Sequence, residues 1–217
     1  MATRIAVLSS APPGPSAAAA VAQADLILDF AGDRANVLAR VGSVLGPAPA
    51  DVPTLARDLL DVAIAVYISD IAVPRGQQEQ WTRDISLLLP VREVNFWQQA
   101  AGDLRRLLHA LTRDNFSLSF YAREGPEAVG EGRELAGAIE PDCVSMLSGG
   151  LDSLAGAVTL QHSGRRPLYS LHRSGNPTVR AAQEHVLAVL ARHWSECSVT
   201  VPYQVAPNTT ATSLPFP

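Results

Sequence analysis

Hydrophobic and polar positions in the first third of the chain repeat with the spacings of a strand and of helices. The apolar run Leu26–Phe30 predicts a short strand, and a helical spacing from Asp33 to Leu45 predicts a helix that a following Gly-Pro pair ends. A second helix with one apolar face is expected over Asp51–Ile71, with Asp51 as its N-cap. This part of the chain therefore predicts one strand and two helices.

The next stretch continues with the same two spacings. Ile85–Val91 predicts a strand, Asn95–Leu111 an amphipathic helix, and Ser117–Tyr121 alternates as a half-buried strand does. We therefore expect an α+β accessory domain over residues 1–135.

Composition changes between Arg123 and Gly137. Glu, Gly and Pro dominate there and large apolar residues are few, which is typical of a linker or a long surface loop. We place a domain boundary at residue 135, so that a second domain covers residues 136–217.

The second domain alternates strands with helices. Strands are expected over Cys143–Leu147, Pro167–His172 and Ser198–Val205, and helices over about Leu151–His162 and Thr178–Trp194. Such alternation predicts a parallel sheet. The expected fold class is therefore α/β, with an N-terminal α+β domain followed by a parallel-sheet domain.

Composition and charge narrow the class of protein. Of the 217 residues, 47% are hydrophobic and 18% are charged, which predicts a folded chain rather than a disordered one. A formal charge of -4 provides no chain-wide positive field, so nucleic acid is not an expected partner. The apolar runs Ile5–Leu8 and Val62–Ile68 are too short for an export signal and a membrane span. A soluble, cytoplasmic protein is expected.

The densest chemical signal is the run Ser148–Ser153, SGGLDS, between a predicted strand and a predicted helix. Its two glycines, Gly149 and Gly150, let the backbone approach a phosphate, and the first amides of a helix can donate hydrogen bonds to it. The Ser148 and Ser153 hydroxyls add donors. Asp152 would be repelled by a polyphosphate unless a cation lay between them. The run therefore predicts ATP with Mg²⁺, the metal being held by Asp152 through the phosphates.

Simpler uses of the same residues remain open. A Gly-Gly pair also makes a tight turn, and a serine or aspartate also caps a helix, although this explains only some of the positions. The Walker pattern is not an alternative, because no Gly-Lys-Ser/Thr follows. His172 and Arg173 follow the next predicted strand, where ligands of open α/β sheets bind, so either could contact the nucleotide.

The run SGGLDS matches the N-type ATP pyrophosphatases. The longer segment SMLSGGLDSLAGAVTL resembles the QueC group, the 7-cyano-7-deazaguanine synthases, and especially the QueC-like proteins of bacterial anti-phage defence operons. The first region is similar to the extra N-terminal domain of those defence proteins in the segments AVYISDIAVPR, WTRDISLLLPV and FWQQAAGDLRRLL. The resemblance implies a PP-loop domain of the HUP-like, adenine nucleotide alpha hydrolase type.

The resemblance also implies a reaction. A deazaguanine-type carboxylate is adenylated by ATP, pyrophosphate leaves, and ammonia or another amine attacks; in defence relatives that amine can belong to a protein partner encoded in the same operon. The catalytic residues would be Asp152 and Ser153, and the strand that ends at His172 would run beside the adenosine. Carried over by position, the residues that hold ATP and its Mg²⁺ would be Ser148, Gly149, Gly150, Leu151, Asp152 and Ser153.

The chain departs from the family in three places. His172 to Asn176 replace the tyrosine, glycine and glutamine expected after the second strand, so we expect an altered substrate side. The family's zinc-binding cysteine cluster is absent, and the chain ends at Pro-Phe-Pro after the third strand. We therefore expect a truncated PP-loop domain that is weak or inactive by itself.

Two alternatives to a QueC-like enzyme remain. One is another amidotransferase or a tRNA-thiolase-like enzyme of the same superfamily, although thiolation is disfavoured because the chain has only two cysteines, Cys143 and Cys197. The other is a catalytically inactive interaction module that retains the loop.

Overall fold

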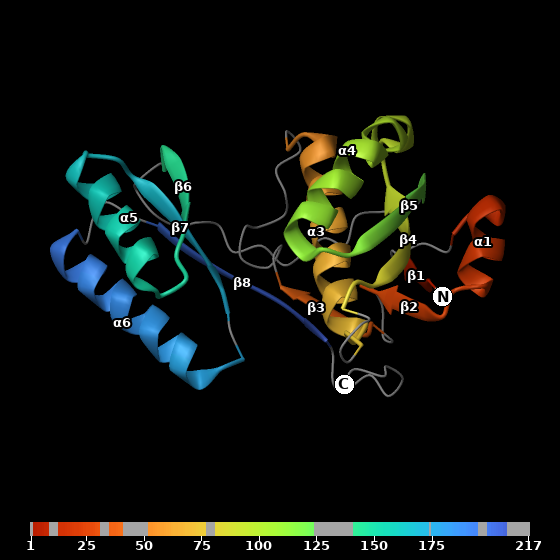
Figure 1. Ribbon diagram of the computed structural model, residues 1–217. Coiled ribbons are helices and arrows are strands. Elements are labelled where there is room, and N and C mark those ends of the chain that lie inside the picture. The colour runs from red at the N-terminus through yellow and green to blue at the C-terminus, as the bar shows by residue number, and fades with distance from the viewer. Residues whose placement is uncertain are drawn as a thin grey trace. The chain divides into compact units, whose positions relative to one another are not determined.

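The computed structural model describes residues 2–8, 13–30, 35–40, 52–76, 81–123, 141–173, 175–194 and 199–207 (Figure 1). The chain forms two compact units. The first contains Met1–Leu38, Ala50–Ala128 and Ala206–Pro217, and the second contains Ala39–Pro49 and Val129–Val205. The predicted boundary at residue 135 lies outside the described residues and stays a prediction. Among the helices of the described ranges, none has the length and apolarity needed to cross a membrane.

The first unit is built on a parallel sheet. Its strands are β1 (Thr3–Leu8), β2 (Leu26–Asp29), β4 (Asp84–Val91) and β5 (Asn115–Ala122), in the order β2-β1-β4-β5. The β1–β2, β1–β4 and β4–β5 pairs are all parallel. Parallel neighbours require crossover connections, which here contain the helices α1 (Pro15–Ala22), α3 (Thr54–Ala72) and α4 (Val94–Thr112).

This sheet corrects the expectation of an α+β first domain, because the unit is α/β. Strand β1 and helix α1 were not predicted, since the apolar run Ile5–Leu8 is short and lacks alternation. Because β1 pairs with both β2 and β4, it joins all four strands into one parallel sheet. The α/β class predicted for the chain as a whole is confirmed.

The strand order also determines where the helices lie. Crossover connections between parallel strands are right-handed, so α1, which leads from β1 to β2, lies on the opposite face from α4, which leads from β4 to β5. Figure 1 shows α1 on one face of the sheet and α3 and α4 on the other. The sheet supplies many of the fully buried side chains of the unit, and α3 adds Ala65 and Ile68; those of the sheet include Ile5, Val7, Leu28, Ile85, Leu87, Leu89 and Val91.

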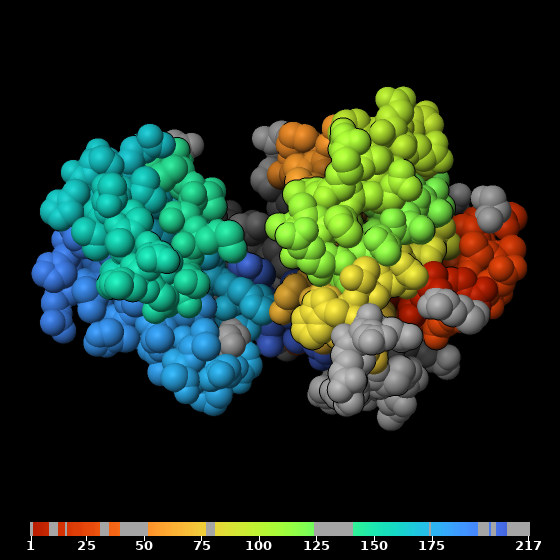
Figure 2. All heavy atoms as spheres, in the orientation of Figure 1, coloured from red at the N-terminus to blue at the C-terminus, as the bar shows by residue number. Residues whose placement is uncertain are grey.

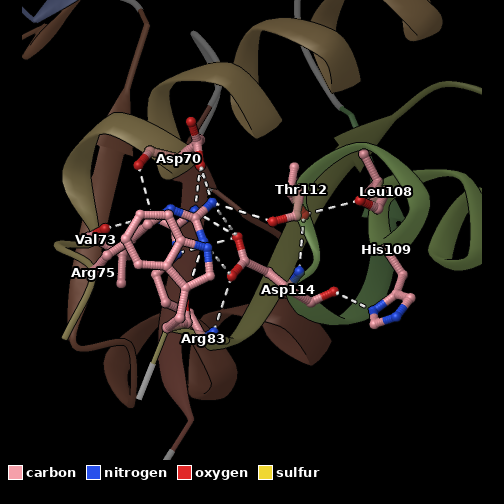
Figure 3. A network of polar contacts seen from close by, with 9 residues as sticks. Asp70, Val73, Arg75, Arg83, Leu108, His109, Thr112 and Asp114 are labelled. Carbon is pink, nitrogen blue, oxygen red and sulfur yellow. Dashed lines mark hydrogen bonds and ion pairs between the residues drawn. The ribbon is translucent and has the colours of Figure 1, made fainter. Parts of the chain in front are cut away.

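Charged residues form a network of ion pairs and hydrogen bonds at the amino-terminal ends of β4 and β5 (Figure 3). Asp114, fully buried before β5, accepts hydrogen bonds from Arg83 Nη2 at 2.5 Å and Arg75 Nη2 at 3.0 Å. Arg83 also donates to the Val73 carbonyl and the Asp70 carboxylate. Burial raises the pKa of Asp114, but hydrogen bonds from Arg83 outweigh it, so the pKa lies below its usual value. The cluster ties the end of α3 to both strands.

The second unit contains β6 (Cys143–Met146), β7 (Pro167–His172) and β8 (Val199–Pro207) as far as Val205, with α5 (Leu151–His162) and α6 (Pro177–His193) between them. The β6–β7 and β7–β8 pairs are parallel. Because the sheet order β3-β8-β7-β6 proceeds in one direction, right-handed crossovers place α5 and α6 on the same face. Their contact with that face forms a core of Leu147, Ala157, Tyr169, Leu171, Val186 and Leu190.

Most predicted elements agree with the structure within three residues, and the parallel sheet predicted for the second domain is confirmed. The helix predicted over Asp33–Leu45 is wrong, because Val37–Arg40 forms strand β3 at the edge of the second sheet. Its apolar spacing suits a helix, but sheet pairing overrides so weak a local preference. Asp51 lies outside the described residues, and it is not the N-cap of α3, which is Pro53.

Candidate nucleotide-binding loop

The predicted loop Ser148–Ser153 lies at the carboxyl end of β6. Met146 is paired with Ser170 of β7, and the amide of Leu147 donates to the Ser170 carbonyl at 2.9 Å, so the ends of these strands are adjacent. The loop follows directly and leads into α5, of which Gly150 is the N-cap. In open α/β sheets, ligands bind at the carboxyl ends of the strands.

Gly149 has a structural reason to be glycine. Its φ is +87°, in the left-handed region that residues with a side chain rarely adopt. A Cβ at this position would lie 2.9 Å from the backbone nitrogen of Gln183 and 3.2 Å from the backbone carbonyl carbon of Ala182, both in α6. The first glycine therefore lets the loop pack against the backbone of α6.

Gly150 differs from its neighbour. Its φ of -86° and ψ of 168° are accessible to any residue, and a Cβ would meet only the Ser148 hydroxyl, at 3.5 Å. Neither backbone conformation nor packing within the described residues requires glycine here. A side chain would nevertheless occupy space beside the first turn of α5.

Hydroxyl groups link the two ends of the loop. Ser148 Oγ donates to Ser153 Oγ at 3.2 Å and accepts from the amide of Gly150 at 3.3 Å, while Ser153 Oγ donates to the Gly150 carbonyl at 2.9 Å. These bonds are exposed, so a phosphate oxygen could compete with them for the same donors. The structure thus brings together three of the residues predicted for the site.

The first turn of α5 faces solvent. Gly150 provides no side-chain cap, and the initial amides of a helix have no partner within the helix itself. Leu151 is 79% exposed and Asp152, the first-turn acid, is exposed as well. Figure 2 shows α5 and α6 on the visible face of the second unit. This end of α5 carries the partial positive charge of a helix N-terminus.

Across the described ranges, no group of three or more His, Cys, Asp or Glu side chains is placed to hold a metal ion. Within those ranges Asp152 is therefore not a member of such a group. A loop with one carboxylate fits an ion that takes its other ligands from phosphate oxygens and water, as Mg²⁺ commonly does.

His172 ends β7 and connects with the loop through Gln183. Gln183, which is 6% exposed, donates from Nε2 to the His172 carbonyl at 3.0 Å while its backbone packs against Gly149. The imidazole itself lies against the Tyr203 ring, with centroids 5.3 Å apart, and its Nε2 lies 3.4 Å from the Val205 carbonyl. The structure thus places the backbone of His172 near the loop and its ring beside β8.

Gln183 is the site residue that the sequence analysis missed. In α6, Val179, Gln183, Val186 and Leu190 share one face because they are spaced four, three and four residues apart. A glutamine within an otherwise apolar stripe could have indicated this residue, since buried polar side chains normally form hydrogen bonds.

Tyr169 links β7 to α5, the helix that follows the loop. Its hydroxyl is buried against α5, accepting from Gln161 Nε2 at 3.2 Å and lying 3.4 Å from the Ala157 carbonyl. Burial raises the pKa of Tyr169, against a smaller lowering by the Gln161 hydrogen bond. The phenol therefore stays neutral and holds α5 onto the sheet.

Comparison with known proteins provides no identification: the chain matches no protein-family model, no curated protein and no solved structure.

Proposed function

We propose that the loop Ser148–Ser153 binds the phosphates of ATP together with Mg²⁺, and that the chain serves a QueC-like ligase of the ATP-pyrophosphatase type. In this reaction a deazaguanine-type carboxylate attacks the α-phosphate of ATP, pyrophosphate leaves, and ammonia or a protein amine then displaces AMP from the acyl group. The loop supports the nucleotide-binding part, and the family resemblance of the sequence supports the choice of substrate.

The observation that carries the proposal is the difference between the two glycines. Packing against Gln183 requires glycine at position 149, whereas nothing in the described residues requires it at position 150. A ligand that approaches the backbone closely accounts for the second glycine, because a Cβ would separate a phosphate oxygen from the first amides of α5.

The remaining residues then have defined tasks. Ser148 and Ser153 exchange their mutual hydrogen bond for bonds to phosphate oxygens. Asp152 orients Mg²⁺, whose charge offsets that of the polyphosphate and makes pyrophosphate a better leaving group. The His172 ring lies beside Tyr203 of β8, so in this proposal His172 contributes through its backbone carbonyl, which accepts a hydrogen bond from Gln183.

The test is calorimetric titration of the full chain with ATP, with and without Mg²⁺. We expect Mg²⁺-dependent binding that Gly150→Ala weakens by at least about tenfold, or about 1.4 kcal/mol, without lowering thermal stability. Asp152→Ala should remove the dependence on Mg²⁺. Gly156→Ala is the matched control, because Gly156 lies within α5 with nothing within 4 Å of an added Cβ. It should leave ATP affinity unchanged.

The second measurement is release of pyrophosphate from ATP when a deazaguanine carboxylate and an amine are present. Release that depends on the carboxylate supports the ligase. Because the chain is expected to be weak or inactive by itself, ATP binding without release supports only the nucleotide-binding part of the proposal. Absence of ATP binding by the wild-type chain in the presence of Mg²⁺ contradicts the whole proposal.

A further inference from the structure

Helix α4 has more apolar surface than the sheet beneath it covers. Trp97 and Leu108 are buried against the first unit, as expected for an amphipathic helix. Beside them runs a second apolar stripe that stays open: Phe96 is 46% exposed, Leu107 54% and Leu111 72%. Large apolar residues grouped on one surface in this way mark an interaction site more often than single ones do.

The stripe borders a groove. Side chains of α3 and α4 enclose an open hollow of about 520 Å³, whose lining is apolar except for one aspartate: Leu55, Ala56, Leu59, Phe96, Trp97, Ala100, Asp103, Leu104 and Leu107. Figure 1 shows α3 and α4 side by side over one face of the sheet, and Figure 2 shows α4 on the visible face of the first unit. Phe96 is part of the lining of the groove, whereas Leu111 lies beyond it.

The stripe is nearly symmetric about the middle of α4. Phe96 and Leu111 are equally far from the point between residues 103 and 104, and so are Ala100 and Leu107. If a second α4 lies antiparallel across the first, Leu111 of each copy meets Phe96 of the other, and Leu107 meets Ala100. Leu107 then faces a small residue, and Leu111 faces Phe96 at the lining of the groove, so that side chains of one helix pack between those of the other. This arrangement has the self-complementarity of a two-fold interface.

Two opposite charges lie at the edge of the stripe, and the point midway between them is one residue from the centre of the apolar pairs. Asp103 and Arg106 form an exposed pair within α4, their side chains being 79% and 80% exposed. At about 100° per residue, both lie on the side of the stripe that faces away from the buried residues Trp97 and Leu108. In the antiparallel arrangement Arg106 of each copy lies two residues, about 3 Å along the helix axis, from the level of Asp103 of the other. A long arginine side chain spans this offset, so two reciprocal ion pairs flank the apolar contact.

We propose that the first unit associates with a second copy of this chain through α4, in an antiparallel two-fold arrangement that seats Leu111 of each copy in the α3–α4 groove of the other. Reciprocal Asp103–Arg106 pairs set the register. The interface uses none of the residues of the loop Ser148–Ser153, so it is independent of the proposed nucleotide binding.

The test measures the molar mass of the full chain by light scattering or sedimentation over a range of concentrations. We expect the wild type to approach twice 23.0 kDa as concentration rises. Leu111→Ser should weaken dimerisation by at least tenfold while leaving the circular dichroism spectrum unchanged, because a 72% exposed side chain contributes little to the fold of one copy. A wild type that stays monomeric at the highest concentration overturns the proposal.

Charge reversal separates this interface from other modes of association. Asp103→Arg and Arg106→Asp should each weaken the dimer, because each places like charges across the two-fold axis. A mixture of the two variants should form a heterodimer, since the arginine introduced at position 103 of one copy then faces the aspartate introduced at position 106 of the other. Arg105→Asp is the matched control on the opposite side of α4 and should leave the mass unchanged. Failure of the mixture to associate better than either variant alone contradicts the antiparallel register.

Discussion

In the first unit the amides of the turn from β4 into α4 donate to a carboxylate of the protein itself. In the second unit the turn from β6 into α5 contains two glycines and no side-chain cap at the start of the helix. The carboxylate is that of Asp58 in α3, which is fully buried. It accepts hydrogen bonds at 3.0 Å from the amides of Arg92 and Glu93 and from Trp97 Nε1. The turn before α5 has no side-chain cap and is open to solvent.

The difference shows two ways of providing acceptors for the unpaired amides at the start of a helix. Burial raises the pKa of Asp58, but hydrogen bonds lower it by more, so the pKa lies below its usual value. These bonds come from the backbone amides of Arg92 and Glu93 and from the Arg92 and Trp97 side chains. Asp58 is therefore held as an anion at the start of α4. Under the proposed function, the phosphates of ATP take the corresponding position at the start of α5.

The largest expected effect comes from breaking the turn in the first unit. Asp58→Ala removes the buried carboxylate that accepts hydrogen bonds from the amides of Arg92 and Glu93 and from Trp97 Nε1, and we expect the free energy of unfolding of this unit to fall by about 3–5 kcal/mol. Urea denaturation followed by Trp97 fluorescence measures it. Asp61→Ala, which removes a half-buried partner of Arg92 and Arg123, is the control and should cost about 1 kcal/mol. Equal losses for both would show that Asp58 is an ordinary surface partner.

The same carboxylates make the first unit sensitive to acid. The pKa values of Asp58 and Asp114 are lowered by folding, so their stabilisation is present above the unfolded value of about 4 and is lost as pH falls through the folded values. We expect the denaturation midpoint to drop below about pH 4, and to drop less in Asp58→Ala. A midpoint that is independent of pH in this range contradicts the ionised state of both groups.

Gly149→Ala tests the turn in the second unit. The positive φ and the approach to Gln183 together should reduce the stability of this unit by about 2 kcal/mol and remove ATP binding. Gly164→Ala is the matched control, because Gly164 has a φ of +75° but nothing within 4 Å of an added Cβ. It should cost about 1 kcal/mol and leave nucleotide affinity unchanged. Hydrogen exchange of α5 and α6 measures the stability, and identical profiles for the two variants would exclude the contact with α6 as the reason for glycine.

Tyr121→Phe tests the centre of the parallel sheet. Pro90 in β4 has no N–H, and the carbonyl of Val7 in the neighbouring strand accepts instead from the Tyr121 hydroxyl at 2.7 Å. Removing this hydroxyl should cost about 1 kcal/mol. Urea denaturation at neutral pH checks this value.

The alkaline limb of the stability profile provides a second readout of the same bond. Burial raises the pKa of Tyr121 to about 12. The stabilisation is therefore present below the unfolded value of about 10 and is lost as pH rises through the folded value. Stability should fall in this range for the wild type and fall less for Tyr121→Phe. Equal alkaline losses would show that another group is responsible.

The smallest expected effect is a gain. Gly156 lies inside α5 with open space around it, so Gly156→Ala should raise the stability of the second unit by about 0.5–1 kcal/mol through helix propensity alone. Thermal denaturation measures it. A loss of stability would contradict the open space around this position.

Local patterns in the sequence were sufficient for most of the second unit. The predicted bounds of Pro167–His172 and Leu151–His162 match β7 and α5 residue for residue. Glycine and proline residues limit these segments, and their apolar spacing is unambiguous, so each element is specified by residues close to it in the chain. The loop Ser148–Ser153 was found for the same reason, since all its residues are neighbours.

The residues that the sequence analysis missed depend on partners far away in the chain. Strand β1 becomes recognisable by pairing with β2 and β4, and Val37–Arg40 joins a sheet whose next strand is β8. In the sequence, Asp58 and Gln183 have no feature that distinguishes them from other polar helix residues. Their roles depend on contacts with Arg92 and Gly149, which only the folded chain brings close.

The sequence by itself thus determined the helices and strands with clear periods, the loop and the α/β class. Only the tertiary structure decided that the first sheet is parallel, that Asp58 fills the start of α4, and that the two loop glycines differ. The reason is that hydrogen bonds between strands and contacts between helices join residues tens of positions apart, whereas periodicity records only the environment of each segment.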